Sequence, residues 1–381
     1  MKLRVLVVDD SALYRQLVKN VLREIPDVEV VGLARTGAEA LKQLAELNPH
    51  LLTLDVQMPD MNGLELLRAL KKHRASVKAI MLSSLTGEGT QVTTDALLAG
   101  AFDFIQKPSS PDANANRVSL LASLSEKLSA FRESMEAKMP RRMSDTSSSQ
   151  SGGEGKSTER HGVDKLLNED ESQSAFRSRT KTELVKRRGP IAAVVIGTST
   201  GGPVALREVL PKLPPTLNVP VFVVQHMPAR YTKSLSERLC ESSMIPIVEA
   251  MDSMKIEANK VYIAPGGLQM RIRASAKGLI IQTTDDPPEH NCRPAVDYMF
   301  RSAAEVYGGN LLAVVMTGMG RDGTEGCRVI KGLGGAVIAQ HPDGCVVYGM
   351  PKAVVEEKLA DRVVPLEKIA SWIVRLVESK E

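Results

Sequence analysis

A serine between glycines is the most reactive feature of the sequence. The apolar run IAAVVIG at 191–197 leads into the turn GTSTG, with Ser199 at its centre, and then into a helical pattern. A G-x-S-x-G turn between a strand and a helix exposes the serine hydroxyl, and the helix N-terminus favours a developing oxyanion. A glycine-rich phosphate loop is the competing interpretation. However, this turn is not G-x-G-x-x-G, and no acidic residue ends the next apolar run.

A nucleophilic serine needs a general base, and the base needs a carboxylate that orients it. Of six histidines, only His226 directly ends an apolar run, VPVFVVQH, and Asp322 lies in the glycine-rich loop GMGRDG just past LLAVVMTG. The competing loop acids are Asp252, Asp285, Asp286 and Asp297. We predict that Ser199, His226 and Asp322 share one edge of one sheet and form a triad. Their order along the chain differs from that of the α/β-hydrolases.

A second set of polar residues ends the apolar runs of the N-terminal region. Asp9 and Asp10 follow the first run, Asp55 ends the third, Ser83 the fourth and Lys107 the fifth. Because the ends of parallel strands meet at one edge of a sheet, these side chains should lie close together. Three carboxylates repel one another unless a cation joins them, and Mg²⁺ suits such a set. A hydroxyl and an ammonium opposite them can hold a phosphoryl group on Asp55.

The elements that position these residues follow from the hydrophobic pattern. In the N-terminal region, helical patterns separate five strand candidates, and Ser11 is a plausible N-cap for the first helix. The strand candidates are 3–8, 28–34, 51–54, 78–83 and 102–105. Five strand–helix repeats predict an α/β domain over residues 1–137, with a parallel sheet covered by helices on both faces.

The composition then changes twice along the chain. Residues 138–189 are rich in Ser, Gly and charge, so they cannot bury enough apolar surface to fold, and we predict a flexible linker. Apolar runs return in residues 190–381, which we predict to be a second, doubly wound α/β domain with a mainly parallel sheet. Its strand candidates are 191–197, 219–225, 260–265, 279–284, 311–318 and 335–340.

Composition narrows the classes of function. The 381 residues are 43% hydrophobic, and no apolar run is long enough to insert into a membrane. The net charge of the chain is +4, and residues 138–190, with 12 Lys+Arg and 8 Asp+Glu, carry all of it. The remaining residues therefore sum to zero, so the charge pattern does not indicate a basic, nucleic-acid-binding face on either folded region. The four cysteines form no C-x-x-C pair, which favours reduced thiols in a cytoplasmic protein.

The first domain resembles the response-regulator receiver family through VVDDS, LDVQMPDMNG, LSS and FDFIQKP, over about residues 1–125. The resemblance implies a flavodoxin-like (βα)5 fold in which Asp55 accepts phosphate from a histidine kinase. It also implies that Asp9, Asp10 and Asp55 hold Mg²⁺. The residues implied to contact the phosphoryl group are Ser83 and Lys107, and Phe104 occupies the aromatic switch position.

The second domain resembles the catalytic domain of the chemotaxis protein-glutamate methylesterases through IGTSTGGP, QHMPARYTKSLSERL, IAPGG and MTGMGRDG. The resemblance implies hydrolysis of glutamate γ-methyl esters on methyl-accepting chemoreceptors, and deamidation of particular receptor glutamines, without a cofactor. It implies an oxyanion hole that includes the Met319 N–H, and the Thr200 N–H is a candidate second donor. It also implies that the unmodified receiver blocks the esterase and that phosphorylation relieves the block.

Three positions depart from the family's usual residues. Gln269 and Cys292 stand where histidine is common, and Tyr231 replaces a usual phenylalanine. These departures bear on substrate preference and regulation, and they leave the triad intact. The alternative interpretation is a response regulator whose output domain binds a nucleotide or acts as a scaffold without catalysis.

Overall fold

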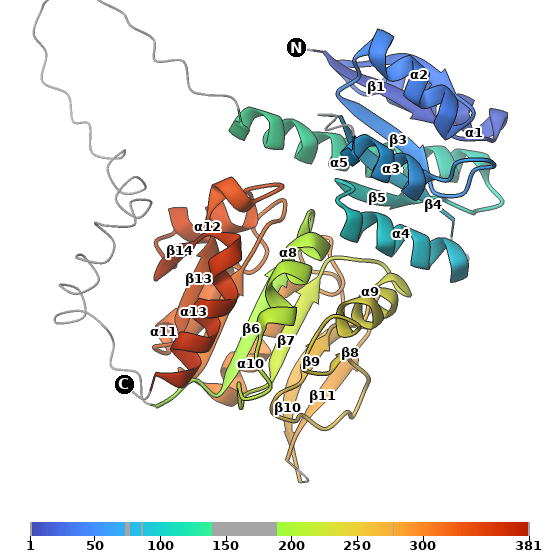
Figure 1. Ribbon diagram of the computed structural model, residues 1–381. Helices are drawn as coiled ribbons and strands as arrows, with labels where there is room; N and C mark the ends of the chain where they lie inside the picture. The colour runs from blue at the N-terminus through green and yellow to red at the C-terminus, as the bar shows by residue number, and fades with distance from the viewer. Residues whose placement is uncertain (1, 73–76, 85–86, 139–188, 277, 380–381) are drawn as a thin grey trace, which may run out of the picture.

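The computed structural model describes residues 2–72, 77–84, 87–138, 189–276 and 278–379. Two parallel sheets, each with helices on both faces, account for most of this chain (Figure 1). The predicted α/β class is therefore confirmed for both regions. The predicted linker lies almost entirely outside the described residues, because the last N-terminal helix continues to Lys138 and description resumes at Gly189.

The N-terminal sheet has the strand order β2-β1-β3-β4-β5, and every strand pair is parallel. Its strands are β1 (Leu3–Val8), β2 (Val28–Ala34), β3 (Leu51–Asp55), β4 (Lys78–Ser83) and β5 (Asp103–Gln106). The helices are α1 (Ala12–Glu24), α2 (Gly37–Leu47), α3 (Gly63–Lys72), α4 (Gly87–Ala99) and α5 (Ala113–Lys138). The five predicted strands are thus present, with β5 displaced by one residue toward the C-terminus.

Alternating side chains explain why helices cover both faces of this sheet. Leu6 and Val8 of β1 belong to the apolar cluster that includes buried residues of α2, α3 and α4, whereas Val5 and Val7 pack with buried residues of α1 and α5. This alternation is typical of a parallel sheet with two buried faces. As predicted, Ser11 caps α1, since its hydroxyl accepts a hydrogen bond from the Tyr14 N–H at 3.3 Å.

The C-terminal sheet has seven parallel strands in the order β14-β13-β12-β6-β7-β9-β8. They are β6 (Ala193–Thr198), β7 (Val221–Gln225), β8 (Ile247–Glu249), β9 (Val261–Ile263), β12 (Leu311–Val315), β13 (Ala336–Gln340) and β14 (Arg362–Val364). The helices are α8 (Gly202–Val209), η1 (Leu210–Lys212), α9 (Tyr231–Cys240), α10 (Val296–Tyr307), α11 (Thr324–Gly332), η2 (Pro342–Gly344), α12 (Met350–Glu356) and α13 (Leu366–Glu378).

Strand β6 shows how this sheet is covered. Val194 and Ile196 pack in the cluster that includes α8, α9 and α13, while Ala193 and Val195 pack in the cluster that includes α10, α11 and α12. The chain leaves β6 toward β7 on one side, and β12 pairs with β6 on the other. The order of the strands therefore reverses at β6, and loops that diverge at such a point form the usual ligand site of an open α/β sheet.

Three strands lie outside the predicted set. Strands β8 and β14 are three residues each, too short for a periodic signal. Strand β10 (Gln269–Ser275) pairs antiparallel with β11 (Gly278–Thr284) in a hairpin separate from the main sheet. The predicted strand at 279–284 thus exists, but it belongs to this hairpin.

The two sheets are joined through their covering helices. Helix α4 of the N-terminal domain lies against α8 and α9 of the C-terminal domain (Figure 1). Buried residues of α4, α8 and α9 belong to one apolar cluster, which continues from one domain into the other. The loops after β6 and β7, which lead into α8 and α9, therefore lie close to the N-terminal domain, and Met319 of the loop after β12 packs against an apolar cluster of that domain.

Candidate functional site

The acidic site of the N-terminal domain assembles at the strand ends, as the pattern predicts. The Lys107 ammonium lies 2.7 Å from an Asp9 oxygen and 2.9 Å from an Asp55 oxygen. Oxygens of Asp9, Asp10 and Asp55 lie within 4.8 Å of one another. Asp9 and Asp55 are buried and Asp10 is exposed, so a cation could contact all three carboxylates while keeping waters on its open side. This donor set fits a hard divalent cation such as Mg²⁺.

Burial controls the charge of Asp55. Burial raises the pKa of the Asp55 carboxyl to about 6; Lys107 lowers it in part, and the nearby Asp9 charge raises it again. At neutral pH the carboxylate is therefore mostly ionised and can act as a nucleophile. The Tyr14 ring lies 4.4 Å below the Lys107 ammonium and closes one side of this site.

Ser83 and Phe104 face the C-terminal domain. The buried Ser83 hydroxyl oxygen lies 2.6 Å from the Thr93 hydroxyl and 3.1 Å from the hydroxyl of Tyr231, which begins α9. The ring of Phe104 lies 4.5 Å from the ring of Tyr231, centroid to centroid. Tyr231, only five positions after His226, thus touches both predicted switch residues of the other domain.

The serine turn is built around close backbone packing. Strand β6 ends at Thr198, and the Ser199 N–H donates to the Thr317 carbonyl at 3.0 Å. Gly201 adopts a φ of 80°, and a Cβ on Gly202 would lie 1.8 Å from the Gln225 amide oxygen, so a larger residue at Gly202 would displace the buried, hydrogen-bonded Gln225 side chain. Ser199 therefore lies immediately before the N-terminus of α8.

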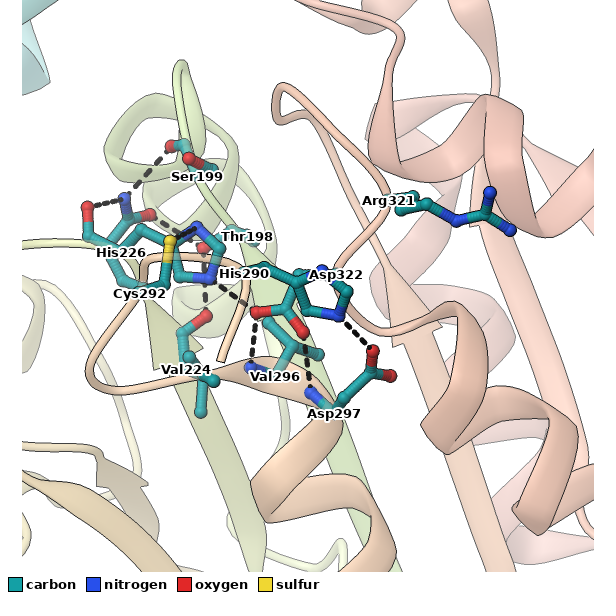
Figure 2. A network of polar contacts seen from close by, with 12 residues as sticks. Thr198, Ser199, Val224, His226, His290, Cys292, Val296, Asp297, Arg321 and Asp322 are labelled. Carbon is teal, nitrogen blue, oxygen red and sulfur yellow. Dashed lines mark hydrogen bonds and ion pairs between the residues drawn. The ribbon is translucent and has the colours of Figure 1, made fainter. Parts of the chain in front are cut away.

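His226 and Asp322 meet across neighbouring loops, as Figure 2 shows. The Nε2 atom of His226 lies 2.8 Å from an Asp322 oxygen. The same carboxylate accepts hydrogen bonds from the N–H groups of Val296 at 2.7 Å and Asp297 at 2.8 Å, in the first turn of α10. A helix N-terminus stabilises a carboxylate, so α10 holds Asp322 ionised and fixed.

Electrostatics couple the two side chains. Burial alone would raise the pKa of Asp322, but hydrogen bonds from His226 and from the two α10 amides lower it. Burial of the His226 ring opposes its charged form, yet contacts with Asp322 and Cys292 outweigh burial and raise the pKa of His226 from 6.5 to about 9. The arrangement therefore favours an imidazolium at neutral pH.

Cys292 occupies the other side of the imidazole. Its Sγ atom lies 3.4 Å from His226 Nδ1 (Figure 2). Within the described ranges, no hydrogen bond joins the Ser199 hydroxyl to His226. The structure thus brings His226 and Asp322 into contact and puts Ser199 at the end of the adjacent strand, while a thiol lies at the second nitrogen of the imidazole.

The predicted oxyanion donors lie in the loops after β6 and β12. Neither the Thr200 N–H nor the Met319 N–H donates a hydrogen bond to any other residue that the structure describes. Met319 follows Gly318 in the loop after β12, and a Cβ on Gly318 would lie 2.8 Å from Ser199 Cβ. The loop with Met319 therefore lies close to the serine.

The N-terminal domain also touches the serine turn directly. The Thr200 hydroxyl donates to an Asp103 oxygen at 2.5 Å, and the Lys127 ammonium lies 3.1 Å from the same carboxylate. Arg238 of α9 pairs with Asp95 of α4 at 2.8 Å. Sequence reasoning missed these contacts because they join residues of two domains, and no local pattern marks them.

A second histidine–carboxylate pair lies behind Asp322. His290 Nε2 is 2.9 Å from an Asp297 oxygen, and Asp297 also accepts from the Gly326 N–H at 2.6 Å. Burial raises the pKa of Asp297, and the nearby Asp322 charge adds to this effect. Asp297, one of the competing acids in the sequence, thus does not contact His226 and anchors α11 instead.

Family models match both domains. The model described as CheB methylesterase matches residues 194–373, and that of the response regulator receiver domain matches residues 5–119. Among the described helices, none combines the length and apolar character required to cross a membrane.

Curated relatives and solved structures match as well. A protein-glutamate methylesterase/protein-glutamine glutaminase of Desulfotalea psychrophila is 43% identical over 379 residues, covering 99% of both chains. The protein of that name from Trichodesmium erythraeum is 38% identical over 377 residues, again covering 99% of both. The crystal structure of the Thermotoga maritima CheB methylesterase catalytic domain is 44% identical, with a TM-score of 0.48, and the match covers 49% of this chain and 98% of that one.

Proposed function

Because the chain belongs to the protein-glutamate methylesterase/protein-glutamine glutaminase family, we propose that it is a phosphorylation-controlled serine hydrolase of chemotaxis adaptation. It hydrolyses glutamate γ-methyl esters on methyl-accepting chemoreceptors and deamidates particular receptor glutamines. The phosphodonor is a chemotaxis histidine kinase, and the enzyme acts in the cytoplasm, where four free cysteines fit a reducing compartment.

One observation carries the catalytic part of this proposal. The His226 imidazole is oriented by a carboxylate that the N-terminus of α10 holds ionised, and Ser199 ends the neighbouring strand at the same sheet edge. A nucleotide-binding or scaffold domain has no use for an oriented base at the same sheet edge as a serine in a strand–turn–helix. Because Nε2 contacts Asp322, Nδ1 is the nitrogen that remains for the serine proton.

The proposed reaction proceeds through an acyl-enzyme. Ser199 Oγ attacks the ester carbonyl carbon while His226 Nδ1 takes its proton, and the carbonyl oxygen becomes an oxyanion beside the N–H groups of Thr200 and Met319. His226 then returns the proton to the departing methoxide, which leaves as methanol. Water, activated by the same imidazole, releases glutamate and restores Ser199. With a glutamine substrate the same steps release ammonia.

The proposed control begins at Asp55. Its carboxylate oxygen attacks the phosphorus of the phosphohistidine, forming an O–P bond while the histidine nitrogen leaves. Mg²⁺, held by Asp9, Asp10 and Asp55, would neutralise charge on the transferring group when bound. Lys107 supplies a second positive charge at this position, where it already lies between Asp9 and Asp55.

Two contacts link this event to the esterase. The Ser83 hydroxyl would be drawn toward the new phosphoryl group, but it is now bonded to the Tyr231 hydroxyl. Asp103 of the receiver holds the Thr200 hydroxyl, one residue from the nucleophile. Phosphorylation therefore competes with the interface that keeps the receiver against the loops of the active site.

The discriminating experiment measures methanol release from methylated chemoreceptor membranes, with and without acetyl phosphate. The proposed function requires release that increases with the phosphodonor, and a fluorophosphonate probe should label Ser199. A nucleotide-binding or scaffold domain would give neither methanol nor label.

Loss of the Tyr231 hydroxyl should loosen the resting enzyme. We expect Tyr231→Phe to raise the unstimulated rate about two- to tenfold, because one hydrogen bond across the interface contributes about 0.5–1.5 kcal/mol. The rate at saturating acetyl phosphate should change little, since that state has already released Ser83. Methanol release from both states measures the effect. Tyr307→Phe is the matched control, because the Tyr307 ring packs on Phe222 of the C-terminal domain and not on the receiver. An unchanged unstimulated rate would refute this linkage.

The raised pKa of His226 should appear in the pH dependence of catalysis. A general base must be neutral, so below a pKa of about 9 the value of kcat/KM should rise about tenfold per pH unit and level off above it. Cys292→Ala removes one of the contacts that raise the pKa, so the inflection should move to lower pH. The measurement is a pH profile of unstimulated ester hydrolysis, with Cys240→Ala as the control. A profile that levels off near pH 6.5 in the wild type would contradict the assignment.

A further inference from the structure

Cys292, His226 and Asp322 form an uninterrupted series of contacts. The thiol sulfur lies 3.4 Å from Nδ1, and the opposite nitrogen, Nε2, lies 2.8 Å from the carboxylate (Figure 2). A sulfur, an imidazole and a carboxylate in this order are the arrangement that activates a cysteine nucleophile. The imidazole can hold the shared proton while the sulfur attacks.

A tight turn fixes the backbone of Cys292 beside His226. The backbones of Glu289 and Cys292 exchange hydrogen bonds of 2.8 and 3.1 Å, and the two residues between them have φ values of 51° and 58°. Such a tight turn leaves little freedom at its ends. Glu289 is further tied to Arg301 of α10 by a 2.5 Å ion pair. The turn therefore holds the Cys292 backbone beside His226, and the sulfur can leave Nδ1 only by rotation of its own side chain.

The other cysteines differ from Cys292 in burial or in partners. Cys327 and Cys345 are buried, and burial raises the pKa of both thiols, which makes them unreactive. Cys240 is partly exposed like Cys292, but no residue in the described part of the chain forms a hydrogen bond with its sulfur. Cys240 thus provides an internal comparison for a thiol without an imidazole partner.

We propose that Cys292 is a reactive thiol in the esterase site, where covalent modification by alkyl halides or peroxides silences the enzyme. With hydrogen peroxide, the sulfur attacks one oxygen, an S–O bond forms and the O–O bond breaks. The sulfur is oxidised by two electrons to a sulfenic acid, and the departing hydroxide takes the thiol proton held by His226 and leaves as water. The modified sulfur then occupies the space beside Nδ1 and keeps Ser199 from its base.

The reactivity is tested by labelling the full chain with limiting iodoacetamide and following each cysteine peptide by mass spectrometry. In this reaction an S–C bond forms and iodide leaves. Cys292 should be alkylated at least about tenfold faster than Cys240, because a positioned base assists its attack. His226→Gln should remove this difference by slowing Cys292 and leaving Cys240 unchanged. Equal rates for the two cysteines in the wild-type protein would overturn the proposal.

The expected loss of catalysis rests on the proposed function. The alkylation rates test the thiol alone, so failure of this proposal can be told apart from failure of the proposed function. Methanol release and fluorophosphonate labelling of Ser199 should both fall in proportion to the fraction of alkylated Cys292. For Cys292→Ala, both should be insensitive to iodoacetamide and to hydrogen peroxide, each measured relative to the untreated variant. Loss of wild-type activity in step with Cys240 alkylation would overturn the proposal, as would full activity after complete Cys292 alkylation. If untreated protein released no methanol, the proposed function would fail, while the labelling rates would still test the thiol.

Discussion

Ser199→Ala should lower methanol release from methylated receptors by roughly 10⁴- to 10⁶-fold, which is the usual cost of losing one member of a catalytic triad. The turn after β6 places only this serine before the N-terminus of α8, beside the loop of Met319. Without its hydroxyl no acyl-enzyme forms. His226→Ala should cause a loss of similar size, because members of one catalytic unit are not additive.

Two comparisons separate loss of chemistry from loss of structure. Phosphorylation of the Ser199→Ala protein by acetyl phosphate should be unchanged, because the proposed phosphorylation site is built from the other sheet. Ser242→Ala, at an exposed position just after α9, should retain the wild-type rate. Demethylation by Ser199→Ala at a rate near that of the wild type would exclude Ser199 as the nucleophile.

Asp55→Asn should abolish activation by acetyl phosphate and leave only the unstimulated rate. An amide cannot accept the phosphoryl group, so the charge of about −1.5 to −2 that would compete for Ser83 never forms. The contacts of Tyr231 with Ser83 and of Thr200 with Asp103 then persist. The measurement is methanol release across a titration of acetyl phosphate.

Chelation of Mg²⁺ should have the same effect on the wild-type enzyme, since the carboxylates of the site then repel the incoming phosphoryl group. Asp60→Asn, an exposed acidic residue in the loop that follows β3, is the matched control and should respond normally. Full activation of Asp55→Asn by the phosphodonor would show that another residue carries the phosphate.

The positions of the candidate site residues at the strand ends could be predicted from the sequence alone. Apolar runs separated by helical patterns require parallel strands, and parallel strands place their C-terminal ends at one edge. Asp9 after β1, Asp55 at the end of β3 and Lys107 after β5 are therefore expected at one edge, as are His226 after β7 and the loop of Asp322 after β12. The contacts of 2.7 Å between Lys107 and Asp9 and of 2.8 Å between His226 and Asp322 follow from this rule.

Short or isolated elements could not be predicted in this way. Strands β8 and β14 have three residues each, and each pairs at the edge of the sheet with one neighbour, β8 with the equally short β9 and β14 with the five-residue β13. The hairpin of β10 and β11 lies outside the main sheet. Its apolar run looks the same in sequence whether it pairs with the sheet or with its own neighbour.

Only the tertiary structure determined how the domains meet and which side chain faces His226. Tyr231 and Ser83 are 148 positions apart, Thr200 and Asp103 are 97 apart, and Cys292 is 66 positions from His226. Periodicity describes how a segment packs against its own sheet, because it reports which side of a strand or helix is apolar. It carries no information about which residues of two separately folded sheets come into contact. Such contacts, and those between distant loops of one domain, depend on the shapes and charges of finished surfaces, which a local pattern does not describe.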